Sequence, residues 1–113
     1  MPKYLFLFRD STERRAQPSP EEMQALQTAW YAWMQKYSSA IVGGDGLKPG
    51  GRVVKAGLVT DGPYVEAKEV IASFSIIQAD NYDAAVAIAK ECPGQDSGDA
   101  CHRIEIREMG GYA

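Results

Sequence analysis

The amino-acid sequence predicts one α+β domain in which two helices cover a single face of a β-sheet. Its 113 residues suit one domain with a core of its own. Strand-like and helix-like patterns follow each other in the order strand, helix, two short strand segments, strand, helix, strand. The predicted strands carry apolar residues on both sides, whereas only two segments have a helical pattern. The sequence therefore also predicts an apolar sheet face that no helix of the chain covers.

The composition is that of an ordinary globular protein, with 45% hydrophobic and 24% charged residues. A formal net charge of −3 and scattered Lys and Arg residues argue against a nucleic-acid-binding face, which needs concentrated positive charge. The apolar run near Met1 is too short for a signal peptide or a membrane span. We therefore expect a cytoplasmic protein that binds neither nucleic acid nor membrane.

The first predicted strand is Lys3–Arg9. Its alternate residues form two apolar sets that point to opposite faces of the sheet, namely Tyr4, Phe6 and Phe8 against Leu5 and Leu7. Because both sets are apolar, we expect this strand to be covered on both sides.

A helix is predicted from Ser19 to about Ser39. Ser19 can cap it, Pro20 suits the first helical position, and Glu22 stands where a capping box places an acidic residue. Apolar residues then recur at helical spacing: Met23, Leu26, Trp30, Trp33, Met34 and Tyr37. This stripe predicts packing against the core, with the lining of a ligand pocket as the less common alternative.

The glycine-rich stretch Gly43-Gly44-Asp45-Gly46 is predicted to break the regular structure after Ile41-Val42. A phosphate-cradling loop is the alternative, but the stretch lacks both the Gly-Lys-Ser/Thr ending and a following helical pattern. Arg52–Ala56 and Leu58–Thr60 are then predicted as short strands that lead to Asp61.

The strand Val70–Ala79 is predicted to have one apolar core face and one mixed face. The core face consists of Val70, Ala72, Phe74 and Ile76, and the mixed face of Ile71, Ser73, Ser75 and Ile77. A face that mixes apolar and hydroxyl side chains is typical of a surface that is covered by another molecule or subunit but still contacts water. Ser73 and Ser75 are therefore candidate ligand-binding residues in a cleft or at a subunit seam.

The end of the chain is predicted to hold a second helix and a last strand. The helix begins in Asp80–Asp83 and ends before Cys92-Pro93-Gly94. The strand Cys101–Met109 alternates apolar and charged residues, with His102, Ile104 and Ile106 opposite Arg103, Glu105 and Arg107. Such alternation is typical of an edge strand with one wet face.

This order of elements fits a ferredoxin-like α+β fold, with the first strand and Val70–Ala79 in the centre of the sheet and the last strand at an edge. Two helices cover only one face of such a sheet. Four apolar residues are expected on the other face: Leu5, Leu7, Ile71 and Ile77. A second copy of the chain, packed sheet against sheet, is the economical cover, so we expect a homodimer.

Asp61 is the leading candidate for a functional residue. It stands on an Asp-Gly-Pro corner, where Gly62 and Pro63 restrict the backbone, between two predicted strands. A carboxylate on a rigid corner beside apolar surface suits proton transfer. The alternative is a structural aspartate that accepts hydrogen bonds from its own turn.

Four other residues are weaker candidates. His102 could act with Asp61 if the last strand came close, but a lone histidine among isoleucines is more often a partly buried structural residue. Tyr64, Arg9 and Arg103 could line a pocket or be ordinary surface. With one histidine and no Cys-x-x-Cys or His-x-x-x-His spacing, the sequence predicts no metal site.

The two cysteines, Cys92 and Cys101, fit a reducing compartment as free thiols, with a disulfide between them as the alternative. Cys92 stands beside Pro93 and has no activating base near it in the sequence, so we do not expect a cysteine nucleophile.

Thr60-Asp61-Gly62-Pro63-Tyr64, followed by Glu66-Ala67-Lys68-Glu69, resembles the signature of the YCII-related proteins, in the branch named for an Asp-Gly-Pro-Phe motif. Tyr64 replaces the phenylalanine of that motif. The resemblance runs from Tyr4 to Met109, makes residues 1–113 a single domain of this type, and implies a dimeric α/β barrel with a cleft between subunits. Some relatives pair the motif aspartate with a histidine near the start of the first helix as a catalytic dyad; Pro18–Met23 holds no histidine.

Two functions of different class follow from these observations. The first is a homodimer without a cofactor that binds a small organic molecule in a cleft near Asp61, with an isomerase- or lyase-like proton transfer. The second is a non-catalytic regulatory or interaction module. The resemblance implies a sigma factor as its partner, since relatives are often encoded beside bacterial extracytoplasmic-function sigma factors. Binding without catalysis is the leading hypothesis.

Overall fold

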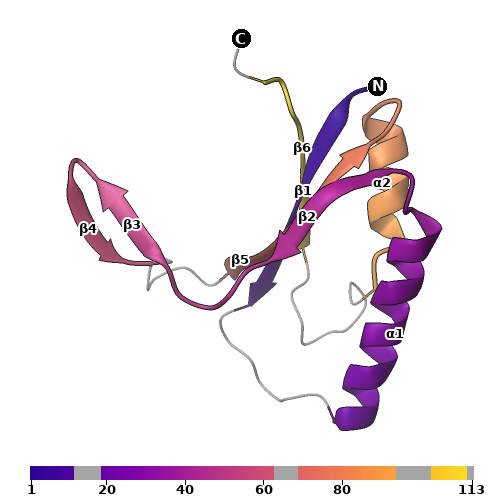
Figure 1. Ribbon diagram of the computed structural model, residues 1–113, viewed down its shortest axis with the longest axis horizontal. Coiled ribbons are helices and arrows are strands. Elements are labelled where there is room, and N and C mark those ends of the chain that lie inside the picture. Colours follow the sequence, from indigo (N-terminus) through magenta and orange to yellow (C-terminus); the bar gives the residue numbers. More distant parts are fainter. Residues whose placement is uncertain (12–18, 63–68, 94–102, 112–113) are drawn as a thin grey trace.

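The computed structural model describes residues 1–11, 19–62, 69–93 and 103–111, and this part of the chain holds six strands and two helices. In chain order they are β1 (Lys3–Ser11), α1 (Pro20–Lys36), β2 (Ile41–Gly46), β3 (Arg52–Lys55), β4 (Leu58–Asp61), β5 (Glu69–Gln78), α2 (Tyr82–Lys90) and β6 (Arg103–Glu108). Four strands form an antiparallel sheet in the order β2-β5-β1-β6, while β3 and β4 pair only with each other (Figure 1). The α+β class, the central strands and the edge position of the last strand are confirmed.

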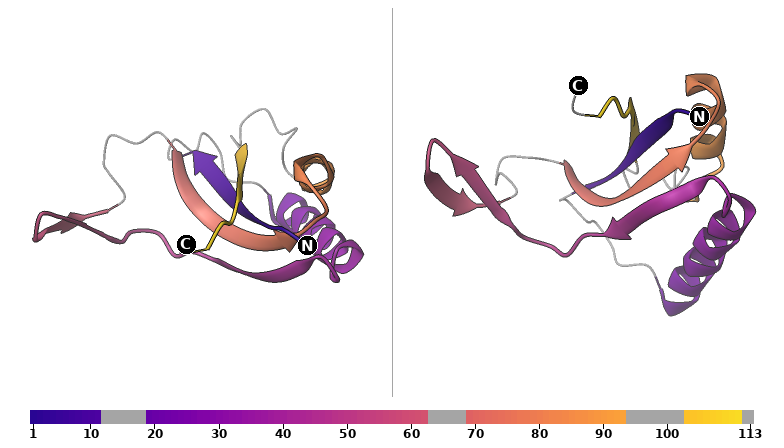
Figure 2. Two further views of the ribbon diagram at one scale, coloured as in Figure 1. Left: turned by 90° about the horizontal axis from the view of Figure 1, so that it is seen from above. Right: turned by 45° about the horizontal axis from the view of Figure 1, so that its top comes forward.

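Both helices lie on one side of the four-stranded sheet, and the core lies between them and the sheet (Figure 2). The aromatic side of β1 faces this core, as the alternation in Lys3–Arg9 predicts. The buried hydrophobic residues are Tyr4, Phe6, Phe8, Trp33, Ile77, Ala79, Ala85, Ala89 and Cys92. The small alanines of α2 allow that helix to approach the strands closely.

The sequence prediction assigned the two faces of β5 the wrong way round. Ile77 pairs with Tyr4, and Ser75 and Ser73 pair with the next two aromatic residues of β1, so the mixed face points toward the helices. Ile77 is fully buried there and does not belong to the uncovered face. The aromatic rings of β1 fill the layer beneath the helices, and small serines opposite them leave the room that those rings need.

The open face of the sheet is the other one. The register places four apolar residues of the central strands there, namely Leu5, Leu7, Phe74 and Ile76, and all four are only half-buried in the single chain. Ile71, which the sequence prediction also assigned to this face, is exposed.

The glycine-rich stretch after α1 is an edge strand, so the prediction that it breaks the regular structure is wrong. Residues Ile41–Gly46 form β2 and pair with β5. At Gly44, whose φ is +146°, a Cβ atom would lie 2.5 Å from the carbonyl oxygen of Phe74. Glycine therefore lets β2 approach β5 more closely than another residue could, and its low strand propensity hid the strand from the pattern.

Ser19 caps α1, as the sequence predicts. The Glu22 backbone N–H donates to the Ser19 hydroxyl over 3.2 Å, and that hydroxyl lies 3.2 Å from the Glu22 carboxylate. The helix ends at Lys36, somewhat before the predicted Ser39. It contacts α2 through the Trp33 indole N–H, which donates a hydrogen bond to the carbonyl oxygen of Ile88 over 3.1 Å.

Only the second half of α1 is anchored in this way. Figure 1 shows its first half extending past the end of the sheet. Trp33 is the one buried residue of the helix, whereas Met23 and Leu26 are 48% and 37% exposed. The stripe predicted for α1 is therefore core at one end and surface at the other.

The hairpin of β3 and β4 projects from the body on the side away from the helices (Figure 1). We call it the arm and define it as residues 52–61. Three of its apolar side chains are largely exposed: Val54 at 69%, Leu58 at 72% and Val59 at 61%. A two-stranded ribbon has no second layer on which to bury such residues.

Candidate functional site

A cleft of about 600 Å³ lies between α1 and the β2–β5 edge of the sheet. The second half of α1 forms one wall and the glycine-rich strand β2 forms the rim. Its lining consists of Phe8, Trp30, Trp33, Met34, Ile41, Val42, Gly43, Gly44, Asp45, Gly46, Ser73, Phe74 and Ser75. The cleft is thus on the helix-covered side, beneath the overhanging helix.

Aromatic rings make the wall of this cleft rigid. Trp30 stands edge-to-face on Phe8, with ring centroids 5.5 Å apart, and on Trp33 at 5.8 Å. The indole of Trp33 is in turn fixed by its hydrogen bond to α2. Interlocked rings of this kind present large apolar surfaces at low entropic cost, which suits a flat organic molecule.

Two hydroxyl groups stand on the floor of the cleft, at Ser73 and Ser75. Both lie on the face of β5 that points toward the helices, where their small side chains leave space between Phe8 and the strand β2. Within the described part of the chain, neither hydroxyl forms a hydrogen bond. The floor therefore offers donors and acceptors to a ligand beside the aromatic wall.

Asp45 is a residue that sequence reasoning missed. Among the described residues that line the cleft, it is the single ionisable one, but its pairing with Phe74 turns its side chain toward the open face of the sheet. There its carboxylate accepts a hydrogen bond from the Gly46 backbone N–H over 2.8 Å. Next to it, nothing lies within 4 Å of the place where a Gly46 side chain would begin. Only the interpretation of the glycine-rich stretch as a strand edge would have placed Asp45 at a cleft.

Asp61, the leading sequence candidate, lies on the arm and does not line this cleft. Its side chain is 92% exposed, and a guanidinium nitrogen of Arg52 lies 3.5 Å from one of its carboxylate oxygens. An exposed ion pair of that length stabilises a protein little. In the single chain the Asp61 carboxylate is thus a solvated group.

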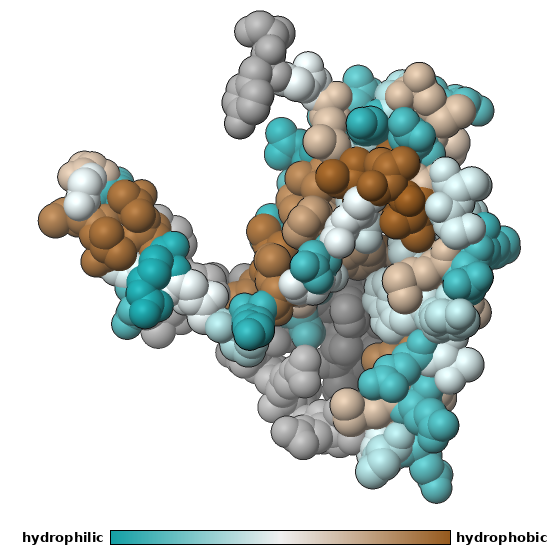
Figure 3. Space-filling view, in the orientation of Figure 1, coloured by the Kyte–Doolittle hydropathy of each residue, from teal (hydrophilic) through white to brown (hydrophobic). Residues whose placement is uncertain are grey.

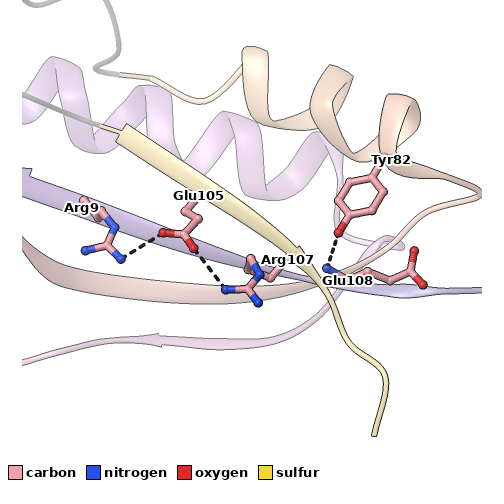
Figure 4. Close-up of polar contacts among 5 residues, drawn as sticks. All are labelled: Arg9, Tyr82, Glu105, Arg107 and Glu108. Atoms are coloured by element: carbon pink, nitrogen blue, oxygen red, sulfur yellow. Dashed lines mark hydrogen bonds and ion pairs between the residues drawn. The ribbon is translucent and has the colours of Figure 1, made fainter.

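Arg9 and Arg103 come together, but on the opposite face of the sheet from the serines. They are direct partners across the β1–β6 pair. Arg9 donates to Glu105 over 3.0 Å, and Arg107 lies 3.5 Å from the other oxygen of that carboxylate (Figure 4). The hydrogen bond from Arg9 lowers the pKa of Glu105 below its ordinary value.

Figure 4 also shows the contact of this edge strand with α2, where the backbone N–H of Glu108 donates to the hydroxyl of Tyr82 over 2.9 Å. The charged side of β6 therefore lies on the open face of the sheet, and its other side is tied to the helix layer. The alternation predicted for Ile104 and Ile106 against Glu105 and Arg107 is confirmed.

Tyr64 and His102 lie outside the described residues. Cys92 is a buried thiol, and burial raises its pKa to about 12. Such a thiol is a poor nucleophile at neutral pH. In the described part of the chain no group of three or more His, Cys, Asp and Glu side chains is placed to hold a metal ion, and no helix is long and apolar enough to cross a membrane.

Comparisons with known proteins identify a family and a structural relative. The model of the YCII-related domain matches residues 3–109. Among solved structures, the chain is similar to 5-chloro-2-hydroxyhydroquinone dehydrochlorinase from Burkholderia phenoliruptrix AC1100, in complex with 2,5-dihydroxybenzoquinone. The two share 17% identity with a TM-score of 0.50, over 96% of this chain and 93% of that one. A search of curated proteins finds no match.

Proposed function

Since the chain belongs to the family of YCII-related domains, we propose that it binds a small flat organic molecule in the cleft between α1 and the β2–β5 edge. The observation that carries the proposal is the pairing of an aromatic wall, Phe8 and Trp30, with two hydroxyl groups on the floor, Ser73 and Ser75. Rings would stack on the wall while polar substituents meet the hydroxyls.

The similar dehydrochlorinase supports this choice of ligand class. Its structure holds 2,5-dihydroxybenzoquinone, a flat ring with carbonyl and hydroxyl groups at its edge. That chemistry matches a cleft with ring faces on one side and hydroxyls on the other. A hydroxylated quinone or phenol is accordingly the first class of compound to test.

The proposal is limited to binding, because the described lining of the cleft holds no acid–base pair. An isomerase- or lyase-like proton transfer by Asp61 requires that this carboxylate reach a bound molecule. We also propose that the chain belongs to the Asp-Gly-Pro-Phe branch of the family, with Tyr64 in place of phenylalanine. The same proposal includes its assembly into a homodimer in the cytoplasm. The apolar open face of the sheet supports the dimer.

Isothermal titration calorimetry with 2,5-dihydroxybenzoquinone and a panel of hydroxylated phenols tests the binding. Gly46→Leu should fill the cleft from its rim without a clash and weaken binding by more than tenfold. Ser75→Ala should weaken it about two- to tenfold, the worth of one hydrogen bond. Ser38→Ala, on the exposed turn after α1, is the matched control and should have no effect.

Two results would contradict the proposal. One is a panel in which no compound binds the wild-type protein. The other is binding that Gly46→Leu and Ser75→Ala leave unchanged, which would place the ligand elsewhere. Asp61→Asn in the same series asks whether the exposed carboxylate contributes to affinity.

A further inference from the structure

The arm and the first half of α1 are the two parts of the described chain that leave the body while carrying exposed apolar side chains. On the arm these are Val54, Leu58 and Val59. In Figure 3 the arm carries a hydrophobic surface that is separated from the body by open space. Since a lone two-stranded hairpin is at best marginally stable in water, the arm needs cover from outside its own strands.

On α1 the exposed residues continue the stripe that forms the cleft wall. Met23 and Leu26 are three residues apart and thus lie on one side of the helix, and Trp30 follows one turn later. Trp30 lines the cleft, so the exposed half of the stripe begins where the cleft opens. Whatever covers Met23 and Leu26 also stands beside the cleft.

The charges of the two surfaces are complementary. Of the two positive residues on the arm, Arg52 lies 3.5 Å from Asp61 of the same hairpin, so Lys55, the cross-strand partner of Leu58, is the positive charge that the arm presents to a partner. The first turn of α1 carries Glu21 and Glu22. Opposite charges that flank matching apolar residues favour one docking partner and one register over others.

The arm does not contact its own α1. The two stand at opposite ends of the longest axis of the molecule, which extends over 46 Å (Figure 1). A second copy related by a two-fold axis reverses this order and can present its α1 where the first copy has its arm. The same operation places the first copy's α1 against the second copy's arm, so both contacts form at once.

We propose that the arm docks on the first half of α1 in a second copy of the chain and there borders the cleft of that copy. The proposal rests on the homodimer of the proposed function and adds that each cleft is completed by the other protomer. The arm alone is too small to hold a dimer, because stable interfaces bury roughly 800 Å² on each partner. It supplements the contact between the open sheet faces.

Disulfide trapping tests the docking. In a Cys101→Ser background, the double variant Leu58→Cys, Leu26→Cys should form disulfide-linked dimers at least tenfold faster than Leu58→Cys, Lys90→Cys. Lys90 is exposed at the end of α2, so the control carries the same number of accessible thiols. The mass of the unmodified protein, measured by light scattering, should be twice the chain mass.

A second readout concerns the charges and the cleft. Lys55→Gln and Glu22→Gln should each raise the dissociation constant of the dimer severalfold. In the double variant the increase should be smaller than the product of the two single increases, because both substitutions remove the same contact. The N-cap bond uses the Glu22 backbone N–H, so Glu22→Gln keeps the start of the helix. Leu58→Ser should weaken binding of 2,5-dihydroxybenzoquinone, although Leu58 lies outside the cleft of its own chain.

The outcomes separate the two proposals. A dimer whose trapping equals that of the control overturns the arm docking and leaves the binding proposal standing. A monomer at micromolar concentration overturns the docking together with the homodimer. Specific trapping without ligand binding by any compound of the panel supports the docking and contradicts the proposed function.

Discussion

The helix-covered face of the sheet and the arm are built from similar residues and have opposite environments. Both consist of strands that carry apolar side chains, yet Tyr4, Phe6 and Ile77 are buried while Val54 and Leu58 are exposed. The difference is the number of layers, since the sheet has helices above it and the arm has none. Apolar alternation therefore identifies a strand, whereas the elements around it decide whether that strand builds a core or an interface.

Phe6→Ala should separate the two environments most clearly. The side chain is fully buried in the centre of the sheet, so its removal should lower the free energy of unfolding by about 3–5 kcal/mol at every protein concentration. Val54→Ala on the arm should change it by less than about 0.5 kcal/mol in dilute protein and lower it only where the protein is dimeric. Urea unfolding at two concentrations measures both, and similar losses in dilute protein would remove the distinction.

Two glycines of β2 give a sharper version of the same comparison. At Gly44 a Cβ atom would meet the Phe74 carbonyl oxygen at 2.5 Å, so Gly44→Ala should cost about 1–3 kcal/mol. Gly46→Ala points into open space and should be neutral within about 0.5 kcal/mol. Urea unfolding of the pair tests whether β2 belongs to the sheet. Equal and small effects would mean that the glycine-rich stretch is not a paired strand.

The cap of α1 should matter less. Ser19→Ala removes the acceptor for the Glu22 backbone N–H and should lower the free energy of unfolding by about 1 kcal/mol. The overhanging first half of the helix should fray, which amide hydrogen exchange in residues 20–26 measures. Ser38→Ala is the control, with no expected change. Unaltered exchange in the Ser19 variant would show that something other than the cap holds this end.

The sequence predicted the fold well because its strongest signals are local. The N-cap at Ser19, the alternation in β1 and the charged side of β6 each depend on neighbours in the chain. The prediction for Gly43–Gly46 was wrong because these glycines are needed for contact with β5, which lies about thirty residues away in the chain. That contact forms only when the chain folds. The faces of β5 failed because both hold isoleucine, and only the register with β1 decides between them.

Of the residues that line the cleft, the sequence singled out Ser73 and Ser75 as candidate ligand-binding residues. Ser73 and Ser75 were chosen because they interrupt an apolar pattern, and the structure places them together on the floor of the cleft. Arg9 and Arg103 lie together on the other face, and Asp61 stands apart on the arm. Asp45 gave no signal, because its position depends on the strand that the glycines concealed. A motif marks a corner of the chain, whereas a cleft is made by elements distant in sequence.

The smallest expected effect concerns the open face of the sheet, at Glu105. Its pKa is lowered first by the hydrogen bond from Arg9, so the ionised carboxylate is the form that this contact stabilises. The contribution to stability is present at neutral pH and is lost as the pH falls through the lowered pKa. Both side chains are about one-third exposed, so solvent screens the pair and the effect on unfolding should be slight.

Nuclear magnetic resonance titration of the Glu105 carboxyl measures this contact directly. Arg9→Gln should raise the midpoint toward the ordinary glutamate value, and Arg107→Gln should raise it less, because its contact is longer at 3.5 Å. In dilute protein, added salt should reduce the difference between wild type and Arg9→Gln, as it does for solvated pairs. If a second copy covers the open face, that salt dependence should weaken as the protein concentration rises. A midpoint that is the same in wild type and Arg9→Gln would show that the ion pair does not form in solution.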